Sequence, residues 1–146
     1  MAVTARVFSL IFTAAFNKEV DLIDDVIKAM ATTVTYVPNQ DTHDYKDDVT
    51  NEVSFTGYTA GGATLANDTI TYTAGTNKWK YDADDVVWTV TGSGTVRIIV
   101  VYDSTPATDA TRPLICYQES SIDVTATDDT LTVQWHADGL VEITIS

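Results

Sequence analysis

The amino-acid sequence predicts an all-β protein: an antiparallel β-sandwich of jelly-roll or immunoglobulin-like type, with about seven to nine strands and at most one short helix. Three observations support this fold class. The 146 residues include 25 Thr and 17 Val, which are β-branched and favoured in sheets. Of the 21 acidic residues, 17 are Asp, which favours turns over helix interiors. Apolar and polar residues alternate at period two in short runs separated by turn residues.

A single domain spanning residues 1–146 is expected. A chain of about 150 residues buries about 68–70% of its unfolded surface, so it needs no metal or disulfide to fold. Hydrophobic residues make up 45% of this chain, which supplies a core of ordinary size. Cys116 is the one cysteine, and it lies in an apolar run, which predicts a buried and unreactive thiol.

The N-terminal segment, residues 1–20, is expected to hold an apolar strand in which Phe8, Leu10 and Phe12 share one face. The run after Arg6 also matches a short signal peptide, an alternative that we set aside in favour of the strand. This segment is the first candidate for docking to a partner. No apolar run reaches the roughly 20 residues that a membrane span requires.

Residues 19–31 allow two interpretations. The stretch 26–30 fits a strand, whereas apolar residues across the whole segment also recur at helix-like spacing. Periodicity alone does not choose between the two. The residues with helix-like spacing are Val20, Ile23, Ile27 and Met30.

Three connecting segments are expected to be irregular. Residues 41–48 fit a short helical turn, with Asp41 or Thr42 as its N-cap. The glycine-rich stretch 57–62 lacks the lysine and the spacing of a phosphate-binding loop, so we expect its glycines to supply positive φ in a loop. Residues 103–112 are polar and form an exposed connection, the second candidate for docking.

Strand patterns are clearest in the second half of the chain. The alternating runs 69–73 and 78–82 are joined by turn residues and predict a β-hairpin. Residues 97–102 are almost continuously apolar, which is typical of a central strand covered on both faces. The pair Asp138-Gly139 predicts a turn that joins the last two strands as a hairpin. The other expected strands are 86–90, 113–118, 130–136 and 141–145.

The charge balance excludes two classes of partner. Eight basic residues against 21 acidic ones give a formal net charge of -13. A protein that binds nucleic acid needs a basic surface to neutralise phosphates. Docking on anionic lipid headgroups requires a basic surface as well. We therefore expect neither a nucleic acid nor a membrane as partner.

No set of residues indicates an enzyme, and no cofactor is expected. The two histidines, His43 and His136, have no serine or cysteine nucleophile near them in the sequence. His43 is followed by Asp44, but neighbouring side chains point apart, so we interpret both as solvated loop or surface residues. Catalytic residues are therefore predicted to be absent.

Acidic clusters offer one candidate for a metal. Asp82, Asp84 and Asp85 are the best local group for a calcium ion, which prefers several carboxylate and carbonyl oxygens. They lack the twelve-residue EF-hand pattern, and paired Asp residues are common in β-turns, so the prediction remains no metal. The three tryptophans fall on apolar strand faces, which favours core packing over a sugar-binding platform: Trp79, Trp88 and Trp135.

The segment GYTAGGATL at 57–65 is the most specific of several motifs in this chain. Together with these other motifs it resembles a family of small virion proteins of tailed bacteriophages and prophages, and the resemblance covers the chain from about residue 24. Before residue 20 the match is poor, and Phe55 stands where relatives look smaller. In relatives, the part aligned with 26–32 looks like a strand, which favours the strand interpretation there. The other matching segments are 36–44 (YVPNQDTHD), 47–49, 51–53 (NEV), 81–88 (YDADDVVW), 100–102, 134–135 and Gly139.

The resemblance implies a structural function. We expect a capsid decoration or cement protein, made in the host cytoplasm and bound to the outside of the virion, with the major capsid protein or another virion protein as its partner. A homo-oligomer is expected, and a trimer is one arrangement that would fit. The alternatives are a neck, tail or head-fibre protein, and a carbohydrate-binding module for host adsorption.

Overall fold

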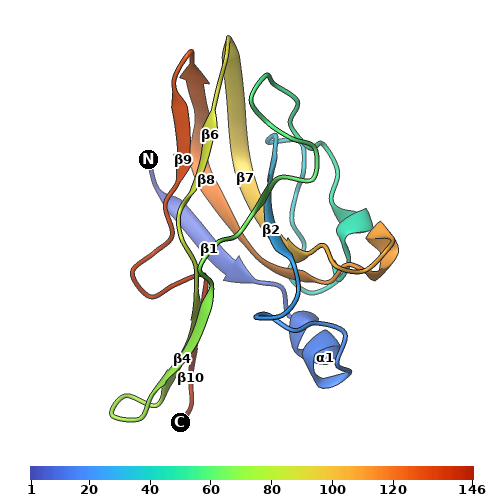
Figure 1. Ribbon diagram of the computed structural model, residues 1–146, viewed down its shortest axis with the longest axis vertical. Helices are drawn as coiled ribbons and strands as arrows, with labels where there is room; N and C mark the ends of the chain where they lie inside the picture. The colour runs from blue at the N-terminus through green and yellow to red at the C-terminus, as the bar shows by residue number, and fades with distance from the viewer.

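The computed structural model describes residues 1–146 and confirms an all-β fold of two packed layers (Figure 1). One layer is a five-stranded antiparallel sheet in the order β1-β8-β7-β2-β3. Its strands are β1 (Val3–Val7), β2 (Ile27–Thr32), β3 (Ala63–Thr64), β7 (Ser93–Asp103) and β8 (Leu114–Thr127).

The second layer consists of two smaller antiparallel sheets. A three-stranded sheet has the order β10-β5-β4, and a two-stranded sheet pairs β6 with β9. The expected hairpin is present, with Ile70 opposite Tyr81 and Tyr72 opposite Trp79. The strands are β4 (Thr69–Thr73), β5 (Lys78–Asp82), β6 (Val86–Thr89), β9 (Thr130–Val133) and β10 (Val141–Thr144).

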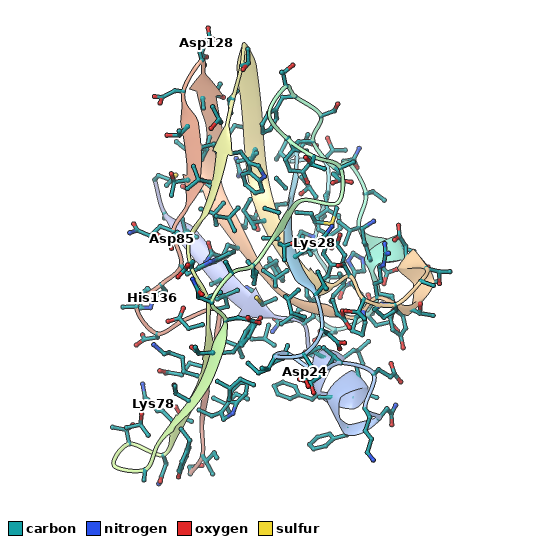
Figure 2. All side chains as sticks on the ribbon, viewed as in Figure 1. Asp24, Lys28, Lys78, Asp85, Asp128 and His136 are labelled. Atoms are coloured by element: carbon teal, nitrogen blue, oxygen red, sulfur yellow. The ribbon has the colours of Figure 1, made fainter.

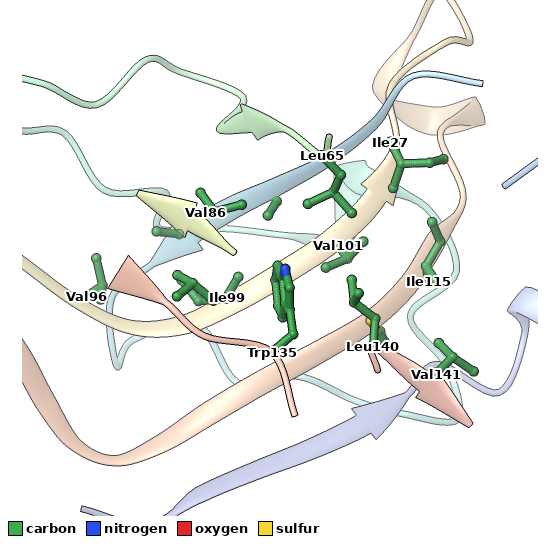
Figure 3. Close-up of a cluster of buried hydrophobic side chains, with 14 of the residues drawn as sticks. Ile27, Leu65, Val86, Val96, Ile99, Val101, Ile115, Trp135, Leu140 and Val141 are labelled. Atoms are coloured by element: carbon green, nitrogen blue, oxygen red, sulfur yellow. The ribbon is translucent and has the colours of Figure 1, made fainter. Parts of the chain in front are cut away.

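The main core lies between the two layers (Figure 3). Twenty-one buried residues form it, because alternate side chains of each strand point inward. Ile99 and Val101 contribute from the large sheet, and Val86, Trp135 and Val141 contribute from the opposite layer. The predicted burial of Trp88, Trp135 and Cys116 is confirmed, and Trp79 is partly buried against the same core.

A smaller core covers the other face of the five-stranded sheet. Val100 and Tyr102 of β7 point away from the main core and pack with Tyr36, which comes from the long segment after β2. Both faces of β7 are therefore buried, as its continuous apolar run predicts. The remaining members of this cluster are Phe8, Met30, Ile98, Leu114 and Tyr117.

The predicted first strand at residues 8–12 is wrong. The strand β1 ends at Val7, and the helix α1 (Ile11–Phe16) follows it. Ile11 and Ala14 are three residues apart and face the core together, so helical spacing satisfies the same apolar residues. Residues 1–20 thus contribute an edge strand and a short helix. None of the helices is long and apolar enough to cross a membrane.

The ambiguous segment and the predicted helical turn both have clear outcomes. Residues 27–32 form β2, which pairs with β7, so the strand interpretation is confirmed. A single 3₁₀ turn, η1 (Lys46–Asp48), lies within the predicted segment, but neither predicted N-cap is used. Instead the side-chain oxygen of Asn39 accepts hydrogen bonds from the backbone N–H groups of Asp41 and Thr42, at 3.0 and 3.2 Å.

The predicted C-terminal hairpin is also wrong. The turn exists, with Gly139 at φ 84°, but the strands on its two sides belong to different sheets. The strand β9 pairs with β6, whereas β10 pairs with β5. Alternating polarity identifies a strand and its buried face but carries no information about its neighbour. The turn therefore transfers the chain from one small sheet to the other.

Candidate functional site

The acidic cluster at 82–85 is not assembled into a metal site. Lys80 Nζ donates to Asp82 at 3.1 Å, and Asn67 donates to Asp84 at 2.6 Å. Asp85 accepts a hydrogen bond from the backbone N–H of Trp135 at 2.9 Å. The three carboxylates thus have three separate partners. No group of three or more His, Cys, Asp or Glu side chains is placed to hold a metal ion.

The acidic turns lie far apart on the molecule, as Asp24, Asp85 and Asp128 illustrate (Figure 2). Asp128 adopts φ 46° in the turn between β8 and β9, and its carboxylate accepts the N–H of Gly92 at 2.7 Å. Such side chains satisfy backbone groups where the chain reverses. The charge is therefore distributed over the loops, as the excess of Asp over Glu predicts.

The histidines and the cysteine lie apart from one another. His136 is exposed, and its Nδ1 lies 3.1 Å from the carboxylate of Asp138. His43 is only half-exposed: its ring stacks on Tyr36, and its Nδ1 lies 3.0 Å from the Tyr36 hydroxyl, so the expected solvated loop residue has a packing role. Burial raises the pKa of the Cys116 thiol to about 12, which keeps it protonated and unreactive.

One buried acid, Asp103, is not predicted from the sequence. Asp103 ends β7 and has a fully buried side chain, of which one oxygen accepts the N–H of Thr105 at 2.8 Å. The other oxygen has no hydrogen-bond partner. Burial raises the pKa of Asp103 above its ordinary value, and the nearby carboxyl of Asp25 raises it further. Nothing in the sequence distinguishes this Asp from the exposed ones at other strand ends.

Replacing Asp103 with asparagine is expected to flatten part of the pH dependence of stability. An Asp in the unfolded chain ionises near pH 4, whereas folded Asp103 keeps its proton to higher pH. Between these two pKa values the folded state binds more protons, so wild-type stability falls as pH rises. The amide resembles the protonated carboxyl, so Asp103→Asn should be more stable than wild type at pH 7. Urea unfolding from pH 4 to 8 gives the free energy of unfolding at each pH. If that free energy depended on pH in the same way in both proteins, the prediction would be contradicted.

A groove of about 430 Å³ is lined by residues of α1 and of the three-stranded sheet. Both elements lie at the same end of the molecule (Figure 1). Ile11 and Ala14 anchor the helix, which leaves Phe12 42% exposed and Phe16 86% exposed. Twelve of the 13 residues that line the groove are hydrophobic. They are Val7, Ile11, Phe12, Ala15, Phe16, Val20, Leu22, Ile70, Trp79, Ile115, Val141 and Ile143, with Asp21 as the one charged member.

The groove is poor in charge on a strongly acidic protein. One of its 13 lining residues is charged, Asp21, and Asp24 and Asp25 follow it in the chain. A partner that enters the groove therefore meets mainly apolar surface. A concentrated patch of exposed apolar side chains marks an interaction surface more often than scattered ones do. We define these 13 lining residues as the apolar groove.

The groove is predicted from the sequence only in part. Residues 1–20 are a predicted docking segment, but the predicted strand places Phe12 on the same face as Phe8. Phe8 is in fact fully buried, whereas Phe12 lies on the helix and lines the groove. The opposite wall, formed by Ile70 and Trp79, comes from a hairpin some 60 residues away in sequence. No local pattern reveals that the two segments meet.

Three segments of the chain meet around Glu52: residues 51–53, the loop 57–62 and the end of β7. The Glu52 carboxylate accepts hydrogen bonds from the Tyr58 hydroxyl and from the backbone N–H of Gly61. The Tyr58 hydroxyl accepts the N–H of Ala31 in turn, and the Tyr102 hydroxyl donates to the carbonyl of Gly61 at 2.7 Å. This network fixes the loop 57–62 to the large sheet.

Comparisons with protein-family models, with curated proteins and with solved structures return no match for this chain.

Proposed function

We propose that this chain is a structural protein of a tailed-bacteriophage virion and not an enzyme. Its role is that of a capsid decoration or cement protein, bound to the outer surface of the major capsid shell. The sequence resemblance at residues 36–44, 57–65 and 81–88 supports the class of protein. The observation that carries the docking role is the apolar groove, whose lining residue Phe16 is almost fully exposed.

The proposed mechanism is stabilisation by binding. A protein that binds the assembled shell and not its free subunits shifts the equilibrium toward the shell. The groove and Phe16 would contact the capsid protein, and the Asp-rich turns would face solvent. A high negative charge on the outside keeps particles soluble and mutually repelling. Open edges remain at β1 and β3 and at β4 and β10, so further pairing between copies of this chain is also part of the proposal.

Replacing Phe16 with serine is expected to reduce occupancy on capsids by at least about tenfold at limiting protein, because aromatic anchors dominate interfaces. The free protein should keep its stability, since Phe16 is 86% exposed. Val37→Ser is the matched control, because Val37 is 76% exposed and lies outside the groove. Binding is measured by co-sedimentation with undecorated particles. Full occupancy by Phe16→Ser would refute docking through the groove.

Point substitution is preferable to truncation of the N-terminus. Removing residues 1–12 would delete β1, which pairs with β8, and would also delete Phe8, which is fully buried. Loss of binding by that truncated protein would therefore report unfolding as readily as docking. A single exposed side chain separates the two effects.

Copy number distinguishes decoration from the other structural roles. A protein present in proportion to the major capsid protein belongs to the shell, whereas a few copies per particle indicate a neck, tail or head-fibre component. Quantitative gel analysis of purified particles measures this ratio. Saturable binding of host cell-wall glycan by the isolated protein would instead favour the carbohydrate-binding alternative.

A further inference from the structure

A second hollow, of about 330 Å³, concentrates positive charge on this acidic protein. It holds three of the chain's eight basic side chains: Lys28, Lys46 and Arg112. Lys28 lies on β2 (Figure 2), Lys46 begins η1, and Arg112 follows η2 (Asp109–Thr111). The two 3₁₀ turns lie side by side (Figure 1). Segments distant in sequence therefore bring these cations to one place.

The two acids in the hollow are already engaged. Asp109 accepts hydrogen bonds from Lys46 and from Arg112, both at 2.7 Å, and these contacts hold the pKa of its carboxyl below the usual range. Glu52 accepts from Tyr58 and Gly61, as described above. Both carboxylates thus have internal donors. The cations outnumber the acids, and Lys28 forms no ion pair.

Unused hydrogen-bond donors in the hollow also favour an anionic ligand. The Lys28 ammonium carries three hydrogen-bond donors, and the Arg112 guanidinium carries five. Arg112 uses two of its five within the protein: Nε donates to the carbonyl of Pro106, and Nη1 donates to Asp109. The Lys46 side chain is only 13% exposed, and its ammonium lies 5.6 Å from the centre of the Tyr102 ring. A partly buried group of cations with spare donors favours a ligand that carries only acceptors and negative charge.

We propose that this hollow is an oxyanion-binding site, in which Lys28, Lys46 and Arg112 hold a carboxylate or a phosphate group. Lys28 supplies the unpaired charge, and the other two cations share Asp109 with the ligand. The site is separate from the apolar groove and does not depend on the proposed docking role.

Titration calorimetry of the full chain with inorganic phosphate and with citrate, at constant ionic strength, tests the proposal. We expect saturable binding of at least one anion, and Lys28→Gln should weaken it by about tenfold or more, as loss of a charged hydrogen bond does. Lys28→Arg should retain binding because it keeps the charge. Lys18→Gln is the matched control, since Lys18 is exposed and lies outside the hollow. The tighter of the two anions identifies the preferred group.

Asp109→Asn should change the affinity for the oxyanion in the direction opposite to Lys28→Gln. Removing the internal carboxylate frees Lys46 and Arg112 for the ligand, so oxyanion binding should tighten while Lys28→Gln weakens it. Circular dichroism and urea unfolding confirm that each variant is folded. Absence of saturable binding with both anions would overturn the site. Equal weakening by Lys18→Gln and Lys28→Gln, or shifts of the same sign in Lys28→Gln and Asp109→Asn, would overturn it as well.

Discussion

Replacing Trp135 with alanine is expected to lower the free energy of unfolding by about 3–5 kcal/mol, the usual loss for a large buried aromatic side chain. Trp135 is 7% exposed and belongs to the core between the two layers (Figure 3). Its indole Nε1–H also donates to the carbonyl of Asp84 at 2.8 Å, which connects the end of β9 to the segment before β6. A loss of this size is a large part of the roughly 5–15 kcal/mol that stabilises a typical domain.

Two further variants separate the contributions of Trp135. Trp135→Phe keeps most of the apolar contact but loses the indole donor, so it should cost clearly less than the alanine variant. Val87→Ala is the surface control, because Val87 is 53% exposed on β6, and its effect should stay within about 0.5 kcal/mol. Urea unfolding is followed by circular dichroism, since the substitution alters tryptophan fluorescence. A loss below about 1 kcal/mol in Trp135→Ala would contradict the packing described for this residue.

Replacing Gly62 with alanine is expected to cost about 2–5 kcal/mol. Gly62 has φ 81°, a conformation that disfavours any residue with a Cβ. The added Cβ would also overlap the carbonyl oxygen of Ala29 and lie 2.6 Å from the Cα of Met30. Both obstacles are main-chain atoms of β2, so a rotamer change does not relieve the overlap. The short strand β3, which pairs with β2 directly after Gly62, should be displaced.

Gly75→Ala is the control for this substitution. Gly75 lies in the turn between β4 and β5, outside the positive-φ region, and an added Cβ there meets no atom within 4 Å. Its stability should change by less than about 1 kcal/mol in either direction. Thermal or urea unfolding of the two variants side by side gives the comparison. Equal effects at both positions would contradict the close approach of residue 62 to β2.

The expected loop at 57–62 illustrates how far local reasoning extends. The sequence predicts that its glycines supply positive φ, and Gly57, Gly61 and Gly62 do so. The reason for glycine at 57 and 62 is nevertheless tertiary, because an added Cβ would overlap the main chain at Thr89 and at Ala29. Composition predicts that the loop is irregular. Only the packed structure identifies the strands that exclude a side chain.

The helix α1 and the apolar groove mark the limit of prediction from this sequence. Residues 8–16 are apolar enough for either a strand or a helix, and in a short segment periodicity does not separate the two. The outcome depends on which surface receives the apolar face. Here Phe8 enters the small core, Ile11 and Ala14 pack on the main core, and Phe16 remains in solvent. The groove forms because α1 is helical and because the hairpin of β4 and β5 lies opposite it.

The position of most strands, and the face that each one buries, can be predicted from the sequence, because alternation at period two is a local property of an extended backbone. On that basis the sequence places Trp88, Trp135 and Cys116 in the core and the Asp residues in the turns. The pairing of β9 with β6 and of β10 with β5 emerges only in the folded protein. The same holds for the three cations that line one hollow. Strand pairing and side-chain clustering depend on contacts between residues far apart in the chain, and those contacts leave no periodic trace in the sequence.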